Sequence, residues 1–188
     1  MADHVCPVWV GHLLTNPFRK IFQNPRLILG PYVTAGMQVL DTGCAMGFFS
    51  LPLAQMVGAN GKVVCVDVQE KMLRALEKRA RKAGLAQRIE TRLCRPDTLD
   101  LKDLAGTFDF VLAFAVVHEV PRADVFYAEI STALKPNGRI MLAEPKGHVN
   151  EEAFASTVDL ALGCDLVFEN LVKIRRSHGV VMRKAAND

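Results

Sequence analysis

Two carboxylates end neighbouring apolar runs of the sequence, and a glycine-containing turn follows the first. One run ends at Asp41 and passes through Gly43 and Gly47 into a helical pattern, and the next ends at Asp67. Gly43 permits a backbone conformation that a Cβ would hinder, and Gly47 allows a helix to approach a strand or ligand closely. A carboxylate after the second run can accept hydrogen bonds from both hydroxyls of a ribose. The pattern predicts a nucleotide-type loop at the carboxyl end of a central strand.

The spacing of this loop differs from that of a pyrophosphate site. A dinucleotide fold requires GxGxxG where the helix begins, whereas this sequence reads Asp41-x-Gly43-x-Ala45-x-Gly47. A carboxylate beside the pocket would repel phosphate and suit a cationic amine. The spacing disfavours an NAD-dependent oxidoreductase, which remains an alternative that nicotinamide nucleotide binding would support.

Candidate groups for proton transfer follow two later apolar runs. His118 and Glu119 come after residues 108–114, and His148 comes after residues 139–143. Adjacent parallel strands end at the same edge of a sheet, and histidine can act as a base near neutral pH. We predict that at least one of these groups contacts an acceptor. The alternative is that each histidine braces its loop by bonding to the backbone.

Cysteines recur near the same strand ends, at Cys44, Cys65 and Cys94. The five cysteines of the chain form no CxxC pair and no metal-ligand spacing. Free cysteine is also a favoured small buried residue. We therefore expect reduced thiols and no metal, and thiol or metalloid chemistry is the less favoured alternative.

The elements that position these residues alternate along the chain. Helical spacing within 69–82 places Met72, Leu73, Leu76 and Ala80 on one side, and Gly84 is suited to end this helix. The predicted strands are residues 37–40, 62–66, 89–93, 108–114 and 139–143, and the predicted helices are 47–57, 69–82, 122–134 and 151–162. The turn at 135–138 closes the third of these helices. This alternation predicts a doubly wound α/β fold, a mostly parallel sheet with helices on both faces.

The two ends of the chain depart from the alternation. Residues 166–172 and 179–183 are predicted strands with no room for a helix between them, which indicates an antiparallel pair. This pair brings the predicted sheet to seven strands in a three-layer α/β/α arrangement. Near the amino terminus, Asn16-Pro17 and Asn24-Pro25 each fit an N-cap followed by proline, so two short helices are expected. They either form a lid over the carboxyl end of the first strand or cover one sheet face.

Composition limits the partners of the protein. Its 188 residues contain 23 Lys and Arg against 20 Asp and Glu, which is too small an excess for a nucleic-acid footprint. The one basic cluster, Lys78, Arg79, Arg81 and Lys82, is interpreted as a solvated helix face. The start of the chain lacks the pattern of a secretory signal, and no apolar run reaches transmembrane length. We expect a cytoplasmic protein that binds neither nucleic acid nor membrane, as a monomer or homodimer.

Taken together, these features resemble the class I, Rossmann-like S-adenosylmethionine-dependent methyltransferases. That family has an acidic residue before GxGxG and a second acid at the end of the next strand. The resemblance runs from about Gly30 to the carboxyl terminus and includes 108–114, 134–139 and the closing strand pair. Within the family, the segments 24–32 and 144–148 are most similar to small prokaryotic members of unassigned substrate. The resemblance implies one domain over 1–188, with an N-terminal helical lid at 1–36 and a Rossmann-like core at 37–188.

The resemblance also implies roles for individual residues. The loop from Gly43 through Cys44 and Ala45 to Gly47 would wrap the methionine part of S-adenosylmethionine, and Asp41 would lie near its amino group. The remaining implied contacts are Asp67 with Val68 at the ribose, Cys94 with Arg95 at the adenine, and Ala113 with Phe114 at the sulfonium. The implied reaction is methyl transfer to a small-molecule acceptor, with S-adenosylhomocysteine as product and no metal.

Two residues depart from the family pattern. Ala45 replaces the middle glycine, and Arg95 stands where an acid near adenine is usual, unless Asp97 supplies that acid through a two-residue shift. Ala45 leaves open a non-catalytic module that binds S-adenosylmethionine or S-adenosylhomocysteine. Methylation of protein or RNA is the other alternative.

Overall fold

The computed structural model describes residues 23–186 and contains one seven-stranded sheet of order β3-β2-β1-β4-β5-β7-β6. All pairings from β3 to β5 are parallel, while β7 is antiparallel to both β5 and β6. The strands are β1 (Gln38–Thr42), β2 (Lys62–Asp67), β3 (Ile89–Leu93), β4 (Phe108–Phe114), β5 (Leu134–Pro145), β6 (Leu166–Leu171) and β7 (Ser177–Lys184). This arrangement confirms the predicted fold class.

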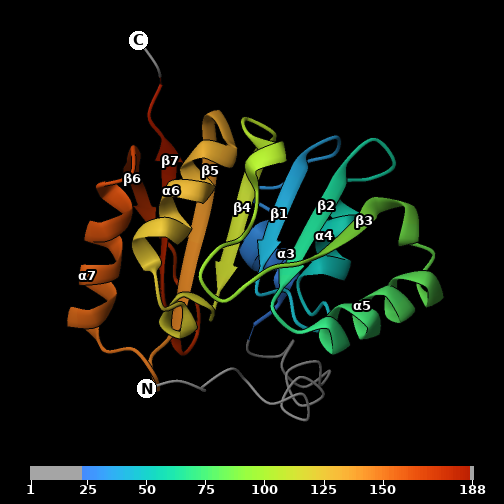
Figure 1. Cartoon of the computed structure of the whole chain (residues 1–188), viewed down its shortest axis with the longest axis horizontal. Coiled ribbons are helices and arrows are strands. Elements are labelled where there is room, and N and C mark those ends of the chain that lie inside the picture. The colour runs from blue at the N-terminus through green and yellow to red at the C-terminus, as the bar shows by residue number, and fades with distance from the viewer. Residues whose placement is uncertain (1–22, 187–188) are drawn as a thin grey trace.

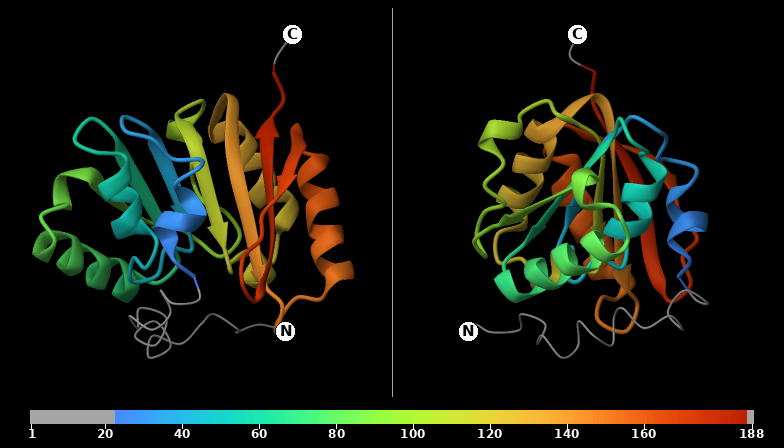
Figure 2. Two further views of the ribbon diagram at one scale, coloured as in Figure 1. Left: turned by 180° about the vertical axis from the view of Figure 1, so that it is seen from behind. Right: turned by 90° about the vertical axis from the view of Figure 1, so that its right-hand side faces the viewer.

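Helices cover both faces of the sheet (Figure 1). The α-helices are α3 (Pro25–Leu29), α4 (Ser50–Met56), α5 (Glu70–Lys82), α6 (Ala123–Ala133) and α7 (Glu151–Leu162). Three short 3-10 turns are η1 (Ala86–Arg88), η2 (Lys102–Leu104) and η3 (Val117–Glu119). Side chains of α6 and α7 belong to one apolar cluster, and those of α3, α4 and α5 belong to a second. Figure 2 shows the resulting layers from behind and from the side.

The strands alternate their side chains between these two clusters. Along β4, Val111 and Ala113 join the α6 and α7 side, whereas Phe110 and Leu112 join the other. Each of these four side chains is completely buried. Strands that are apolar on both faces are typical of parallel sheets sandwiched between helix layers. The core of the protein therefore lies on both sides of its sheet.

Strand β1 is the topological switch point of the sheet. It pairs with β2 on one side and with β4 on the other. From β1 the chain first proceeds outward to β2 and β3, then crosses to the other side of β1 and proceeds outward through β4 and β5. Open α/β sheets bind ligands in the crevice outside the carboxyl ends of the strands at such a point. This edge of the sheet is the lower one in Figure 1.

Most boundaries lie within two residues of the predicted ones, and the largest differences are at the starts of α4 and β5. Helix α4 begins at Ser50 rather than at residue 47, because the preceding loop contains residues of positive φ. Strand β5 begins at Leu134 rather than at residue 139 and already pairs with Phe108 there. The predicted turn at 135–138 is consequently an irregularity within β5, where the register to β4 shifts.

The described part of the amino-terminal region packs on a face of the sheet. The side chain of Asn24 accepts a hydrogen bond from the Arg26 amide at the start of α3, as its N-cap pattern predicts. Leu29 is completely buried, and the ring of Tyr32 stacks on that of Phe110 with 6.2 Å between centroids. The helix expected at Asn16-Pro17 lies outside the described residues, so the lid over the site stays a prediction. Within residues 23–186, no helix is long and apolar enough to cross a membrane.

Candidate functional site

A cavity lies at the carboxyl ends of β1, β2, β3 and β4. The loops after these four strands supply most of its lining. Of the predicted cofactor-binding residues, those that line the cavity are Asp41, Gly43, Cys44, Ala45, Asp67, Val68, Cys94, Arg95 and Phe114. Gly47 and Ala113 are not among the lining residues. The structure thus brings nine of these eleven residues to one cavity.

The loop after β1 is held in a conformation that its glycines permit. Gly43 has φ +63°, and a Cβ there would meet Val116 Cγ2 at 2.5 Å. Gly47 has φ +82°, and a Cβ there would overlap the side chain of Leu76 on α5. Ala45 also has positive φ, at +45°. The alanine that departs from the family pattern therefore adopts the left-handed backbone that glycine would adopt more readily.

Asp67 connects the loops after β1 and β2. Its carboxylate accepts hydrogen bonds from the amides of Ala45 at 2.9 Å and Gln69 at 2.8 Å. Burial raises the pKa of Asp67, and the backbone hydrogen bonds partly offset this effect. The carboxylate lines the cavity while its amide partners fix its orientation.

Asp41 is the second buried carboxyl group of the cavity and is 3% exposed. Burial raises its pKa to about 7, although the hydrogen bond from Ser50 Oγ, at 2.6 Å, lowers it. Desolvation without a nearby cation favours the neutral form. A cationic ligand in the cavity would reverse this preference. Ser50 was missing from the predicted site because its role depends on the turn that carries it back to Asp41.

The loop after β3 forms the opposite wall and is clamped from α6. The carboxylate of Glu129 accepts hydrogen bonds from the Leu99 amide at 2.6 Å and from Thr98 Oγ1 at 2.5 Å. Arg95 is exposed and pairs with Asp97, with 3.5 Å between Nε and Oδ1. Burial raises the pKa of Cys94 to about 12, which keeps its thiol protonated at neutral pH. Sequence reasoning missed Glu129, which lies about thirty residues from the loop it holds.

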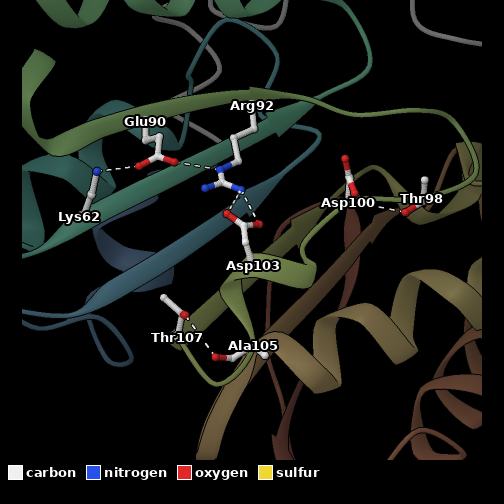
Figure 3. A network of polar contacts seen from close by, with 8 residues as sticks. All are labelled: Lys62, Glu90, Arg92, Thr98, Asp100, Asp103, Ala105 and Thr107. Atoms are coloured by element: carbon white, nitrogen blue, oxygen red, sulfur yellow. Dashed lines mark hydrogen bonds and ion pairs between the residues drawn. The ribbon is translucent and has the colours of Figure 1, made fainter.

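An ion-pair network anchors the start of this wall at the edge of the sheet (Figure 3). Arg92 on β3 contacts both oxygens of Asp103 at 2.8 Å and also bonds to Glu90. Glu90 in turn pairs with Lys62 on β2 at 2.6 Å. The network joins two strands to η2, and the wall loop lies between β3 and η2.

The basic cluster on α5 is not uniformly solvated. Lys78, Arg81 and Lys82 are exposed as predicted, whereas Arg79 is half-buried and donates a hydrogen bond to the carbonyl oxygen of Met46. This contact corrects the interpretation of the whole cluster as a solvated face. Arg79 occupies the face of α5 that packs towards the glycine loop, so it supports the loop from outside the cavity.

The predicted proton-transfer groups gather after β4 and β5. Glu119 lines the cavity, and His118 lies beside it. The ring of His148 stacks on that of His118 with 5.6 Å between centroids. His118 Nδ1 lies 2.5 Å from Glu144 Oε2, and this buried carboxylate was absent from the predicted site. The convergence of the two histidines from adjacent strand ends is therefore present, but only Glu119 of the three predicted residues lines the cavity.

The four described cysteines, Cys44, Cys65, Cys94 and Cys164, are free thiols. Within the described part of the chain, no group of three or more His, Cys, Asp or Glu side chains is placed to hold a metal ion.

Comparison with known families agrees with this geometry. A family model described as a methyltransferase domain matches residues 33–177. Among solved structures, a SAM-dependent methyltransferase from Aquifex aeolicus superposes with a TM-score of 0.85, covering 95% of this chain and 99% of that one. The two sequences are 23% identical. This likeness shows the shared fold.

Curated relatives share more of the sequence over part of their length. Demethylmenaquinone methyltransferase of Lactobacillus johnsonii is 33% identical over 118 residues, which are 63% of this chain and 48% of that protein. Ubiquinone biosynthesis O-methyltransferase of Bradyrhizobium diazoefficiens is 30% identical over 137 residues, which are 73% of this chain and 50% of that protein. The chain spans about half the length of these relatives.

Proposed function

The chain belongs to the methyltransferase domain family, and from this premise we propose that it transfers a methyl group from S-adenosylmethionine to a small-molecule acceptor. One observation carries the proposal. Two buried carboxyl groups, Asp41 and Asp67, line one cavity on either side of a loop that includes Ala45 and Gly43. This arrangement combines a site for a cationic amine with a site for ribose hydroxyls.

The residues present fit the proposed cofactor. Burial raises the pKa of Asp41 to about 7 and so favours its neutral form, whereas a ligand ammonium group would favour its charged form. Asp67 is oriented by two amides and remains at the cavity surface, where ribose hydroxyls can donate to it. Side-chain atoms at Gly43 would collide with Val116, so this part of the wall depends on bare backbone. We assign Cys44, Ala45 and Gly47 to the methionine part, Val68 to the ribose, Cys94 and Arg95 to the adenine, and Ala113 and Phe114 to the sulfonium end.

The bound cofactor supplies a methyl group already activated by the positive charge on sulfur. The protein then has to position the acceptor and, where the acceptor carries a proton, remove it. The candidates for contact with the acceptor are Glu119, His118 and His148, which lie together at the end of β4 and β5.

A small molecule is the acceptor class that the relatives support best. Both curated relatives are named for small molecules, demethylmenaquinone in one and ubiquinone biosynthesis in the other. The modest net charge of +3 also favours a small acceptor over RNA. We further propose that the protein is cytoplasmic, needs no metal and acts as a monomer or homodimer.

Calorimetric titration tests the cofactor. The purified protein is titrated with S-adenosylhomocysteine, S-adenosylmethionine and NAD, alongside Asp67→Ala and a matched surface control, Asp159→Ala. We expect micromolar binding of both sulfur nucleotides, lost in Asp67→Ala and retained in the control. Absence of binding to either sulfur nucleotide would refute the proposal, and binding of NAD alone would favour an oxidoreductase.

Acceptor screening separates an enzyme from a binding module. Methyl transfer from radiolabelled S-adenosylmethionine to pooled small molecules supports the proposed reaction. Cofactor binding without turnover on small molecules, protein or RNA would instead indicate a non-catalytic module.

A further inference from the structure

A buried carboxylate near the end of β5 is fully engaged by the loop after β4. Glu144 is 1% exposed. One of its oxygens accepts a hydrogen bond from the Val117 amide at 2.8 Å, and the other lies 2.5 Å from His118 Nδ1. Glu144 therefore fixes both the backbone of η3 and the ring of His118.

Within residues 23–186, His118 is the only basic group that forms an ion pair with Glu144. Tyr127 faces it from α6, and the Tyr127 hydroxyl has no hydrogen-bond partner among the described residues. His178 is its register partner on β7, but the Nε2 atom of His178 lies 3.1 Å from the Val149 carbonyl. A buried carboxylate is costly unless it is paired. The pairing group in this position is His118.

His118 lies between two carboxylates. Its Nδ1 atom faces Glu144, while its Nε2 atom lies 3.9 Å from Glu119 Oε1. The hydrogen bond to Glu144 raises the pKa of His118, and the charges of Glu144 and Glu119 act in the same direction. The ring of His148 stacks on the ring of His118. The raised pKa extends the pH range in which His118 is protonated, and His118 is not among the residues that line the cavity. Glu119 does line the cavity, so it is better placed than His118 to take a proton from an acceptor.

The positions of the three residues assign different tasks to them. Glu119 lines the cavity, His118 stands behind it, and Glu144 anchors His118 from the neighbouring strand. Building on the proposed methyl transfer, we propose that Glu119 is the group that receives the proton of the acceptor, and that Glu144 is a positioning residue acting through His118. The acceptor is accordingly one whose attacking atom carries a proton that is lost on methylation, such as a hydroxyl, an amine or a thiol.

In the proposed step, the attacking atom of the acceptor forms a bond to the methyl carbon, and the electron pair of the broken carbon–sulfur bond remains on the sulfur of the cofactor. The proton of the acceptor passes to the Glu119 carboxylate, which is neutral at the end of the step and returns the proton to water. His118 keeps its own proton throughout and holds Glu119 in place by charge.

Imidazole titration by NMR tests the pairing without any ligand. The resonances of His118 are followed against pH in the wild type, Glu144→Gln, Glu119→Gln and a matched control, Glu169→Gln. The control removes a carboxylate of β6 that pairs with Arg139 of β5. We expect the pKa of His118 to fall by about one unit or more in Glu144→Gln, less in Glu119→Gln, and to remain unchanged in the control. An unchanged pKa in Glu144→Gln would overturn the positioning role. Should Glu144→Gln not fold, the pKa of His118 in Glu119→Gln is compared with that in the wild type, and an unchanged value there overturns the pairing of His118 with Glu119.

Turnover tests the role of Glu119. With a hydroxyl or amine acceptor from the screen, we expect Glu119→Gln to lower kcat by 10²–10⁴-fold and to leave S-adenosylhomocysteine affinity within a few-fold of wild type. Equal kcat in Glu119→Gln and wild type, or turnover confined to acceptors that lose no proton on methylation, such as tertiary amines, would overturn the assignment. Because the NMR shift requires neither cofactor nor acceptor, failure of the proposed methyl transfer and failure of the Glu144 pairing give separate results.

Discussion

The amide of Ala45 donates a hydrogen bond to the carboxylate of Asp67, with 2.9 Å between nitrogen and oxygen. Ala45 belongs to the loop after β1, Asp67 is the last residue of the adjacent strand β2, and both line the cavity. Ala45 directs this amide while its φ is +45°. The alanine thus preserves the hydrogen-bonding geometry of the loop at the expense of backbone strain.

Replacing Ala45 with glycine is expected to stabilise the protein. An L-residue in the left-handed region costs roughly 1–2 kcal/mol, and glycine would relieve this strain. The greater flexibility of glycine in the unfolded chain offsets only part of the resulting gain in stability. We expect Ala45→Gly to raise the free energy of unfolding by about 0.5–1 kcal/mol, measured by urea denaturation. The matched control is Ala83→Gly, at an exposed helix end with φ −88°, which should be slightly destabilising. A loss of stability in Ala45→Gly as large as in the control would show that the loop is not strained.

Stability should depend on pH through Asp41. Its pKa is about 7 in the folded protein and near the ordinary value of 3.8 in the unfolded chain. Between these values the unfolded chain binds fewer protons at this group than the folded protein does, so the contribution of Asp41 to stability is greatest below pH 4 and is lost as the pH rises to about 7. The full decrease from this group is about 4 kcal/mol.

The Asp41→Asn variant isolates this effect, because asparagine can still accept the hydrogen bond from Ser50. Urea denaturation at several pH values between 4.5 and 7.5 should give a flatter profile for the variant than for the wild type. Asp67 also has a raised pKa and contributes in the same direction, but it is present in both proteins. Parallel profiles would mean that Asp41 ionises normally.

Removing the clamp on the wall after β3 should weaken cofactor binding more than it weakens the fold. Glu129→Ala removes the acceptor of both the Leu99 amide and the Thr98 hydroxyl. We expect about a tenfold loss in S-adenosylhomocysteine affinity by calorimetry, equivalent to about 1.4 kcal/mol. Glu152→Ala on the exposed face of α7 is the matched control and should bind as the wild type does. Equal affinities in the two variants would mean that the contacts of Glu129 with the loop do not contribute to cofactor binding.

The ion pair between Arg92 and Asp103 should be weak and sensitive to salt. The Asp103 side chain is 60% exposed, and exposed pairs are typically worth about 0.2–1 kcal/mol. A double-mutant cycle with Arg92→Gln and Asp103→Asn should give a coupling energy in this range at low ionic strength. The coupling should decrease at about 0.5 M salt because screening acts on exposed charges. A coupling that is large and independent of salt would contradict this expectation.

Most of the fold followed from local patterns in the sequence. The strand Phe108–Phe114 and the helix Glu151–Leu162 have the predicted bounds, since their apolar spacing and flanking breakers are local properties. The start of β5 was wrong because the pairing of Leu134 with Phe108 extends the strand through residues that locally favour a turn.

The site was predictable where a residue faces the cavity directly from a strand end. Asp41 and Asp67 are in this class. Glu129 and Glu144 act through contacts with residues 30 and 26 positions away in the sequence, which no local spacing indicates. Ser50 lies nine residues after Asp41 and reaches it only through the turn between them. Glu144 did leave one signal, a charged residue that continues the apolar run of β5, which is unusual unless its charge is paired.

The order of folding events follows from the place of β1 between β2 and β4. Thr42 Oγ1 donates a hydrogen bond to the Leu112 carbonyl, which lies 70 residues away in the sequence. Contacts between such distant residues form slowly, because the entropy cost of closing the loop comes before any stabilising contact is made. One wall of the cavity comes from each side of this pairing, so the cavity exists only once the two halves of the sheet have joined. A ligand that contacts both walls therefore cannot bind a partly folded chain in which the two halves are still apart. Its binding shifts the folding equilibrium towards the completed sheet by mass action.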